Sequence, residues 1–403
     1  MIPKVNGIEK GTEGKFVLPE ERISFYGEQI YVKVLRERLE KRGVALRWEQ
    51  VQEEKDAAIV IRLNRACVDL RAENARAENV QIGSSPGAYS LHITPQQIIA
   101  AAADEEGIAN ALTTLYWKLR EGNGICGCVF IEDTPVYSWR GFHLDVSRHF
   151  FDAETVKSMI EQCALRKMNR LHWHISDDQG FRIESERFPK LNKIGSWRKE
   201  SDGSTYGGFY TRDEVKEIVA YAKERGLEIV PEIDMPGHVS AMLAAYPQLS
   251  CSGEEMCVPV MAGIHPRILC AGKDETLRFV YELLDDMIEL FPSVYVHIGG
   301  DEAPKSEWQK CPACQARMHA EGLKDEEELQ AWFTKKVLEH LQKKGKTGIC
   351  WNESMKSGTL APEAVVQYWD EEDGAGYCRE LAKGERKCIY SFTPAFYLSL
   401  IHI

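Results

Sequence analysis

Two adjacent carboxylates, Asp301 and Glu302, follow a short apolar stretch and a pair of glycines in the segment HIGGDE at 297–302. An apolar stretch ended by Gly-Gly is typical of a buried strand that leads into a tight turn. Carboxyl groups at such a position can donate and accept protons, as general acid–base catalysis requires. An isolated Asp-Glu pair is more often part of a solvated helix turn, so the rest of the sequence must decide the interpretation.

Other polar and aromatic residues follow other predicted strands. They are Asp145 and Arg148, Asp177 and Asp178, Asp234 and His238, Trp351 and Glu353, and Trp369 and Asp370. Carboxylates supply protons and accept hydrogen bonds from hydroxyls, and indole faces stack on the C–H faces of pyranose rings. Carboxylates and tryptophans gathered at one site therefore indicate a neutral sugar as the substrate. Glu353 and Asp370 are left without a role.

The elements that must position these residues alternate between strand and helix. We predict strands at 141–146, 171–175, 227–234, 294–298, 347–351, 365–369 and 387–391. The clearest helix begins at Thr211, where Glu214 completes a capping box, and ends at Gly226. Seven strands in series with polar residues at their C-terminal ends predict a (β/α) barrel of the TIM type, an α/β fold with its active site at those ends.

The region before the barrel has a different pattern. Strands are predicted at 57–63 and 89–94, and an amphipathic helix at 106–120. No cluster of catalytic side chains is expected there. We predict a small, non-catalytic α+β domain at residues 1–135 and the barrel at residues 136–398.

Composition limits the class of protein. The 403 residues are 44% hydrophobic and 28% charged, with a formal net charge of −12. Nucleic acid is not expected as a partner, because phosphate binding needs a basic face. No apolar run is long enough for a membrane span, and no signal peptide is expected, so we predict a cytoplasmic protein whose twelve cysteines are reduced. The sequence leaves the oligomeric state open.

Four segments resemble the motifs of glycoside hydrolase family 20, the β-N-acetylhexosaminidases, in the order of that family. They are RGFHLDVSRHF at 140–150, HWHISDD at 172–178, PEIDMPGH at 231–238 and HIGGDE at 297–302. The resemblance extends over about residues 20–398 and implies a (β/α)8 barrel preceded by a small domain. It also implies a retaining exo-acting enzyme for terminal β-linked GlcNAc or GalNAc, with a carbohydrate or glycoconjugate substrate and neither cofactor nor metal.

Adjacent residues of a strand point in opposite directions, which argues against two carboxylates facing each other across a glycosidic bond. The resemblance implies substrate assistance instead, in which the 2-acetamido oxygen attacks the anomeric carbon and forms an oxazoline. The residues implied are Glu302 as acid and base, Asp301 on the acetamido N–H, Arg148 on sugar hydroxyls, Trp351 and Trp369 as pocket walls, Tyr397 on the acetamido oxygen, and Asp177, Asp234 and His238 as a supporting polar network.

Three alternatives stay open. His172 and His174 share a strand face, so with Asp177 or Asp178 they could bind a metal in a barrel metallohydrolase. The family resemblance implies instead that these histidines pack and support the site. A lacto-N-biosidase-like glycosidase and a noncatalytic glycan-binding relative are the other two. The presence of both Asp301 and Glu302 disfavours the noncatalytic relative.

Cys311-Pro312-Ala313-Cys314 forms a CxxC motif. A structural zinc site needs a second pair of ligands, and Cys251 with Cys257 does not have the matching spacing. We therefore expect a loop or a helix start here rather than a metal or redox site.

The last residues depart from the family pattern. Ser399 stands where the family has an Asp, and residues 399–403 are expected to be a non-native tail. The barrel is accordingly expected to lack its last strand, with two open edges and low activity as a result.

Overall fold

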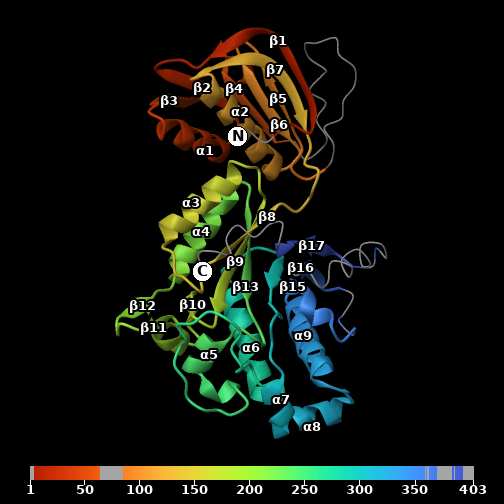
Figure 1. The fold of residues 1–403 in the computed structure, drawn as a ribbon. Coiled ribbons are helices and arrows are strands. Elements are labelled where there is room, and N and C mark those ends of the chain that lie inside the picture. Colours follow the sequence, from red (N-terminus) through yellow and green to blue (C-terminus); the bar gives the residue numbers. More distant parts are fainter. Residues whose placement is uncertain are drawn as a thin grey trace. The chain divides into compact units, whose positions relative to one another are not determined.

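The structure, a computed structural model, describes residues 4–63, 85–358, 360, 363–369, 384 and 386–393. The chain divides into two compact units, whose elements are labelled in Figure 1. The first unit comprises Met1–Phe142, Lys157–Arg170 and Ala220–Glu228. The second comprises His143–Val156, Leu171–Val219 and Ile229–Ile403. Tyr397 and the expected tail lie outside the described residues.

A mixed sheet and two helices form the core of the first unit. Its elements are β1 (Gly7–Val17), β2 (Arg22–Tyr26), α1 (Gln29–Glu40), β3 (Arg47–Gln50), η1 (Glu54–Asp56), β4 (Ile59–Leu63), β5 (Tyr89–Ile93), β6 (Ile98–Ala102), α2 (Glu105–Glu121) and β7 (Ile125–Asp133). The strand order is β1-β7-β5-β6-β4-β2-β3. The apolar stripe of α2 packs into the core, because Ile108, Ala111, Leu112, Leu115 and Leu119 are all buried. The predicted strands and helix of this region are confirmed with ends shifted by one or two residues.

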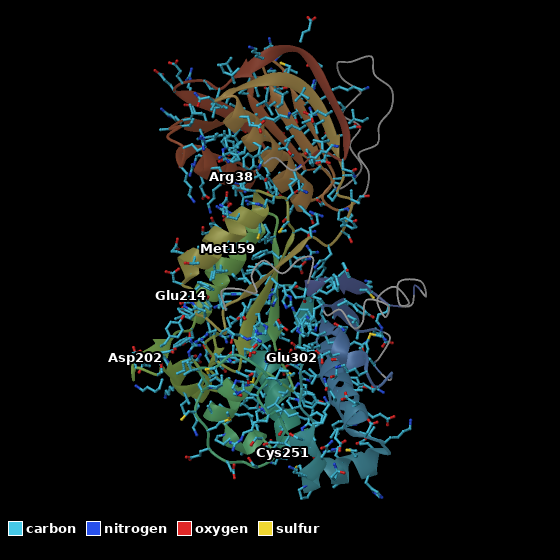
Figure 2. All side chains as sticks on the ribbon, viewed as in Figure 1. Arg38, Met159, Asp202, Glu214, Cys251 and Glu302 are labelled. Atoms are coloured by element: carbon cyan, nitrogen blue, oxygen red, sulfur yellow. The ribbon has the colours of Figure 1, made fainter. Side chains whose placement is uncertain are left out.

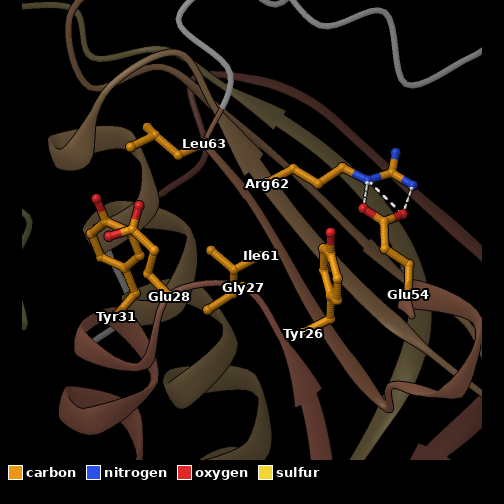
Figure 3. A pocket seen from close by; sticks show the side chains of 8 residues that line it. All are labelled: Tyr26, Gly27, Glu28, Tyr31, Glu54, Ile61, Arg62 and Leu63. Atoms are coloured by element: carbon orange, nitrogen blue, oxygen red, sulfur yellow. Dashed lines mark hydrogen bonds and ion pairs between the residues drawn. The ribbon is translucent and has the colours of Figure 1, made fainter. Parts of the chain in front are cut away.

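A depression of about 370 Å³ on this unit is lined by Tyr26, Gly27, Glu28, Tyr31, Glu54, Ile61, Arg62 and Leu63 (Figure 3). The Arg62 guanidinium bonds to the Glu54 carboxylate, with Nε 3.1 and 3.2 Å from its two oxygens. The charges of Arg62 and Glu54 are therefore occupied with each other.

The rest of the chain alternates strands and helices. Its strands are β8 (Gly141–Asp145), β9 (Arg170–Asp177), β10 (Gly180–Phe181), β11 (Trp197–Lys199), β12 (Thr205–Gly207), β13 (Glu228–Ile233), β14 (Tyr295–His297), β15 (Thr347–Trp351), β16 (Val365–Tyr368) and β17 (Cys388–Tyr390). Its helices are α3 (Ala153–Ala164), η2 (Leu191–Gly195), α4 (Arg212–Glu224), α5 (Ser240–Ala245), η3 (Pro247–Leu249), α6 (Asp274–Ile288), α7 (Ser306–Lys310), α8 (Pro312–Glu321), α9 (Glu326–Lys343) and η4 (Asn352–Met355).

The barrel strands are neighbours in chain order, β9-β13-β14-β15-β16-β17, with β8 paired to β9. The pairs from β13 to β17 are parallel. This is the strand order of a (β/α) barrel, so the predicted fold class is confirmed, and each of the seven predicted strands is present within two residues of its expected ends. Parallel pairing brings the C-terminal ends of these strands to one edge of the sheet.

Helix α4 shows how local sequence sets an element. Thr211 donates its backbone N–H to Glu214 Oε2 at 2.8 Å, and Glu214 donates its own to Thr211 Oγ1 at 3.2 Å. This is the reciprocal pair of a capping box, as predicted. Gly226, with φ of 78°, follows the end of the helix. No helix within the described ranges combines the length and the apolar character needed to cross a membrane.

Candidate active site

A two-glycine turn after β14 places Asp301 and Glu302. Gly299 has φ of 65° and Gly300 has φ of 107°. Residues other than glycine rarely adopt such positive φ values. A Cβ at Gly299 would lie 1.6 Å from Asp234 Oδ1, so only glycine fits. Gly300 donates its N–H to the same Asp234 oxygen at 3.1 Å. The turn is therefore fixed by a buried carboxyl group at the end of the neighbouring strand β13.

Asp301 and Glu302 both approach one nitrogen of His238. Nε2 of His238 lies 3.6 Å from Asp301 Oδ2 and 3.4 Å from Glu302 Oε2. Strand alternation predicts opposite directions for adjacent side chains, but it does not apply here. β14 ends at His297, and Glu302 has a left-handed backbone with φ of 43°. Glu302 is labelled in Figure 2, and a third of its side chain is exposed.

His238 follows β13 and joins these two carboxylates to a second pair. Its Nδ1 lies 3.2 Å from Asp177 Oδ1 and 3.3 Å from Asp178 Oδ2. Burial disfavours a charged imidazole, but the Asp177, Asp178 and Asp301 carboxylates outweigh it and raise the pKa of His238 far above its ordinary value. The four carboxylates of Asp177, Asp178, Asp301 and Glu302 around the ring favour its charged form.

Asp177, at the end of β9, is the buried centre of the polar network. Its Oδ2 lies 2.7 Å from Arg148 Nη2 and 2.6 Å from His174 Nε2, and its Oδ1 accepts the Asp178 N–H at 2.6 Å. Burial would raise the pKa of Asp177, yet the charges of Arg148 and His238 prevail and hold it below its ordinary value.

Arg148 follows β8 and presents a guanidinium to the same edge. Nη1 lies 2.9 Å from Asp145 Oδ2, and a third of the side chain is exposed. Burial opposes its charge, but Asp177 and Asp145 raise the pKa of Arg148 well above the ordinary value. The guanidinium is thus a permanently charged donor held by two carboxylates, a geometry suited to paired hydroxyl oxygens.

Asp234 differs from Asp177 because it is buried and, among the described residues, forms no ion pair with a cation. Burial, reinforced by the charge of Asp301, raises the pKa of Asp234 well above its ordinary value. Its Oδ1 accepts the Gly300 N–H, while Oδ2 has no hydrogen-bond partner among the described residues. Asp234 is therefore placed to hold the turn through the hydrogen bond from the Gly300 N–H.

Glu353 had no predicted role, and the structure gives it one. Its Oε1 accepts the backbone N–H of Glu302 at 3.2 Å, and its Oε2 pairs with Lys356 at 2.9 Å. Burial raises the pKa of Glu353, although Lys356 opposes this. The residue restrains the left-handed backbone of Glu302. The signal in the sequence for a role in the site was the position of Glu353, two residues after the end of the strand predicted at 347–351.

The two predicted pocket tryptophans lie at neighbouring strand ends. Trp351 ends β15 and is 9% exposed, and its indole N–H donates to Glu232 Oε1 at 2.9 Å. Trp369 follows β16, and its backbone N–H donates to Asn352 Oδ1 at 3.1 Å. The Trp369 indole nitrogen has no partner in the described part of the chain. Tyr397 and Asp370 lie outside the described residues.

The histidines of β9 share one face, as predicted. His172 Nε2 and His174 Nδ1 lie 2.9 and 2.5 Å from Glu232 Oε2, whereas Trp173 packs on the other face against Tyr210 with ring centroids 4.9 Å apart. Burial lowers the pKa of His172 to about 3, so this ring is neutral. His143, His172 and Glu232 bring their donor atoms within 4.8 Å of one another, and so do His174, Asp177 and Asp234. Glu232 and Asp177 already accept several hydrogen bonds from neighbouring side chains. These hydrogen bonds explain why the side chains of each cluster lie close together.

Known proteins are similar to this chain in sequence and in fold. Residues 137–402 match the catalytic domain of glycosyl hydrolase family 20. The chain is 48% identical over 246 residues to a β-hexosaminidase of Porphyromonas gingivalis, covering 61% of this chain and 32% of that protein. It is 37% identical over 324 residues to a β-hexosaminidase of Akkermansia muciniphila, covering 78% of this chain and 65% of that protein. The chain thus spans less than two thirds of the length of these relatives.

Solved structures give the same result. A β-N-acetylhexosaminidase from Bacteroides fragilis matches with a TM-score of 0.82 and 33% identity, over 96% of this chain and 74% of that one. A family 20 exo-β-N-acetylglucosaminidase from Vibrio harveyi, solved with N-acetylglucosamine, matches with a TM-score of 0.80 and 28% identity, over 97% and 60% of the two chains. With its four motifs, its barrel strand order and this match, the chain belongs to glycosyl hydrolase family 20.

Proposed function

We propose that this protein is a retaining exo-β-N-acetylhexosaminidase, which releases terminal β-linked GlcNAc or GalNAc by substrate-assisted catalysis. The observation that carries the proposal is the position of Asp301 and Glu302, both within 3.6 Å of one His238 nitrogen and next to a charged Arg148 network. The names of the relatives, β-hexosaminidase and exo-β-N-acetylglucosaminidase, support the same substrate class.

In the first step, the 2-acetamido oxygen of the substrate attacks the anomeric carbon while the glycosidic C–O bond breaks. Glu302, a third exposed, gives its proton to the leaving oxygen. The ring that forms carries positive charge on the acetamido group, and the Asp301 carboxylate holds its N–H. Positioned groups of this kind can each contribute about 10²–10⁴-fold to the rate.

In the second step, the same Glu302, now ionised, takes a proton from water. The oxygen of that water bonds to the anomeric carbon, the oxazoline C–O bond breaks, and the β configuration is retained. The sugar is held by the Arg148 guanidinium on its hydroxyls and by the indoles of Trp351 and Trp369 around the acetamido group. Tyr397 completes this set as the donor to the acetamido oxygen, a role proposed from the family motif.

The test is hydrolysis of 4-nitrophenyl N-acetyl-β-glucosaminide by the purified chain. We expect Glu302→Gln to lower kcat/KM by about 10³-fold or more, because general acid and general base are lost together. Glu255→Gln, an exposed residue outside the site, is the control and should be unaffected. Wild-type turnover in Glu302→Gln would refute the assignment of the acid.

Two further measurements address the mechanism. The 4-nitrophenyl β-glucoside, which lacks the acetamido group, should not be hydrolysed, and a thiazoline mimic of the oxazoline should inhibit competitively. NMR of the product should show the β anomer first. Inversion, with no effect of the thiazoline, would favour direct attack by water as in a metallohydrolase. Release of a disaccharide rather than a monosaccharide would favour the lacto-N-biosidase alternative.

A further inference from the structure

Four cysteines that are far apart in the sequence meet at one point of the second unit. Cys251 follows η3, Cys270 precedes α6, and Cys311 and Cys314 flank the first turn of α8. Their four sulfur atoms all lie within 4.8 Å of one another. Cys270 and Cys314 are fully buried, Cys311 is nearly so, and Cys251 is partly exposed. The CxxC motif at 311–314 thus has a second pair of thiols, Cys251 and Cys270, in place of the pair Cys251 and Cys257 that the sequence suggested and its spacing excluded.

Three of the six sulfur–sulfur separations match the edge of a metal tetrahedron, and all six are within 4.8 Å. Cys251 and Cys314 are 3.8 Å apart, Cys270 and Cys311 are 3.8 Å apart, and Cys270 and Cys314 are 3.6 Å apart. Four thiolates around one zinc ion at a Zn–S distance of about 2.3 Å have an edge of about 3.8 Å. Two disulfides would instead divide the four atoms into two close pairs. All four residues are free cysteines.

The backbone around the cluster is shaped to hold the sulfurs together. Cys311 caps α8, and Pro312 occupies its first turn, which sets the two thiols of the CxxC motif on one side. Gly272 packs directly on the backbone of α8, because a Cβ there would lie 2.2 Å from the carbonyl carbon of Ala313. On the other side, Cys270 donates its N–H to the Leu249 carbonyl at 2.8 Å.

We propose that Cys251, Cys270, Cys311 and Cys314 bind one Zn²⁺ in a closed, structural tetrathiolate site. A tetrahedral set of four soft sulfur ligands with no open position is the preferred structural site of zinc. Zinc also neutralises two of the four thiolate charges in a chain whose formal net charge is −12.

The site fastens two segments that both reach the candidate active site. Cys251 and Cys270 lie in the segment after β13, which carries His238, while Cys311 and Cys314 lie in the segment after β14, which carries Glu302. The two segments also meet at the active site itself, where a Cβ on Gly237 would lie 3.1 Å from the Asp301 carbonyl oxygen. Figure 2 shows Cys251 well apart from Glu302, so the zinc has a supporting rather than a catalytic position.

The experiment measures zinc in the purified 403-residue chain after dialysis against buffer without metal. We expect one zinc per chain by plasma mass spectrometry, and X-ray absorption should show four sulfur atoms at about 2.3 Å. Cys270→Ser should lose at least nine tenths of the zinc. Cys257→Ser is the matched control, because Cys257 is an exposed cysteine in the same segment but outside the cluster.

If Cys270→Ser does not fold, the proposal can be tested on the wild-type protein instead. Titration with a mercurial that modifies thiols should then release zinc, detected with a colorimetric chelator, as the four cluster thiols react. Gly272→Ala keeps every thiol but moves the backbone of α8, and we expect it to release zinc at a lower mercurial concentration. Absence of stoichiometric zinc, full zinc in Cys270→Ser, stoichiometric iron, or disulfides among these cysteines would each overturn the proposal.

Discussion

Replacement of Gly299 by alanine tests how the turn after β14 places Asp301 and Glu302. Gly299 has φ of 65°, and a Cβ there would lie 1.6 Å from Asp234 Oδ1 and 2.9 Å from the Asp234 Cα atom. The carboxyl group cannot move aside, since Asp234 is buried and accepts the Gly300 N–H. We therefore expect the turn itself to shift, by about 1 Å, the order of the overlap in the structure.

Two costs add in this variant. A left-handed alanine costs about 1–2 kcal/mol, and overpacking a buried site costs about 1–3 kcal/mol. Gly299→Ala should thus lower the free energy of unfolding by about 2–5 kcal/mol. A catalytic group that moves by about 1 Å can lose about 10²-fold in rate. We expect kcat/KM for the aryl N-acetylglucosaminide to fall by that amount.

Gly345→Ala is the matched control. Gly345 follows α9 with φ of 73°, and a Cβ there would meet no atom within 4 Å. It should show the backbone cost alone, about 1–2 kcal/mol, with unchanged kcat/KM. Urea unfolding and initial rates on both variants provide the comparison. If Gly299→Ala loses no more stability than Gly345→Ala and keeps its activity, the reasoning about the turn is refuted.

Three other changes follow from buried groups and a helix cap. Burial lowers the pKa of His172 to about 3, against about 6.5 in an unfolded chain, so the unfolded state binds an extra proton between these values. The free energy of unfolding should therefore fall on acidification from pH 6.5 towards 3, by up to about 1.4 kcal/mol per pH unit. His172→Gln should reduce this slope, measured by urea unfolding at several pH values. An equal slope in the variant and the wild type would contradict the prediction. Glu161→Gln should lower the free energy of unfolding, measured in urea, by about 3 kcal/mol. The reason is that the buried Arg38 and Arg225 each place Nε within 2.8 Å of a Glu161 carboxylate oxygen. A loss of less than about 1 kcal/mol would show that these ion pairs contribute little. Thr211→Ala should remove the capping box at a cost of about 1 kcal/mol, measured as a lower Tm, and an unchanged Tm would show that the cap adds nothing.

The seven barrel strands and helix α4 were predictable because their sequence patterns are local, whereas β1, β2, β3, β6, β7 and α1 of the first unit were not predicted. The strand at 347–351 was predicted to the residue, and the capping box of Thr211 and Glu214 appears with both of its hydrogen bonds. Such patterns depend on neighbours within a few positions along the chain. Their order along the chain, strand then helix, was enough to indicate parallel pairing and hence the common edge at which the polar residues gather.

The site was predictable in its residue types but not in its contacts. Family motifs supplied Asp301 and Glu302, which follow β14, and His238, which follows β13. The bond from the Glu302 backbone to Glu353 joins positions 51 apart, and no local pattern reveals it. The cysteine cluster is a stronger case, because Cys251 and Cys270 become partners of the CxxC motif only when two separate strand-to-helix segments fold against each other.

The left-handed backbone of Glu302 also depends on contacts with residues far away in the sequence. A residue other than glycine with φ of 43° carries a strain of about 1–3 kcal/mol and persists only where its surroundings hold it. In an extended conformation, Glu302 and Asp301 would point in opposite directions, and only one could face a bound sugar. The left-handed conformation brings both carboxylates near His238, as the proposed roles of Glu302 as acid and Asp301 as holder of the acetamido group require. Asp234, which fixes the turn before this residue, and Glu353, which accepts its N–H, stabilise a local geometry that the segment 297–302 would not adopt alone.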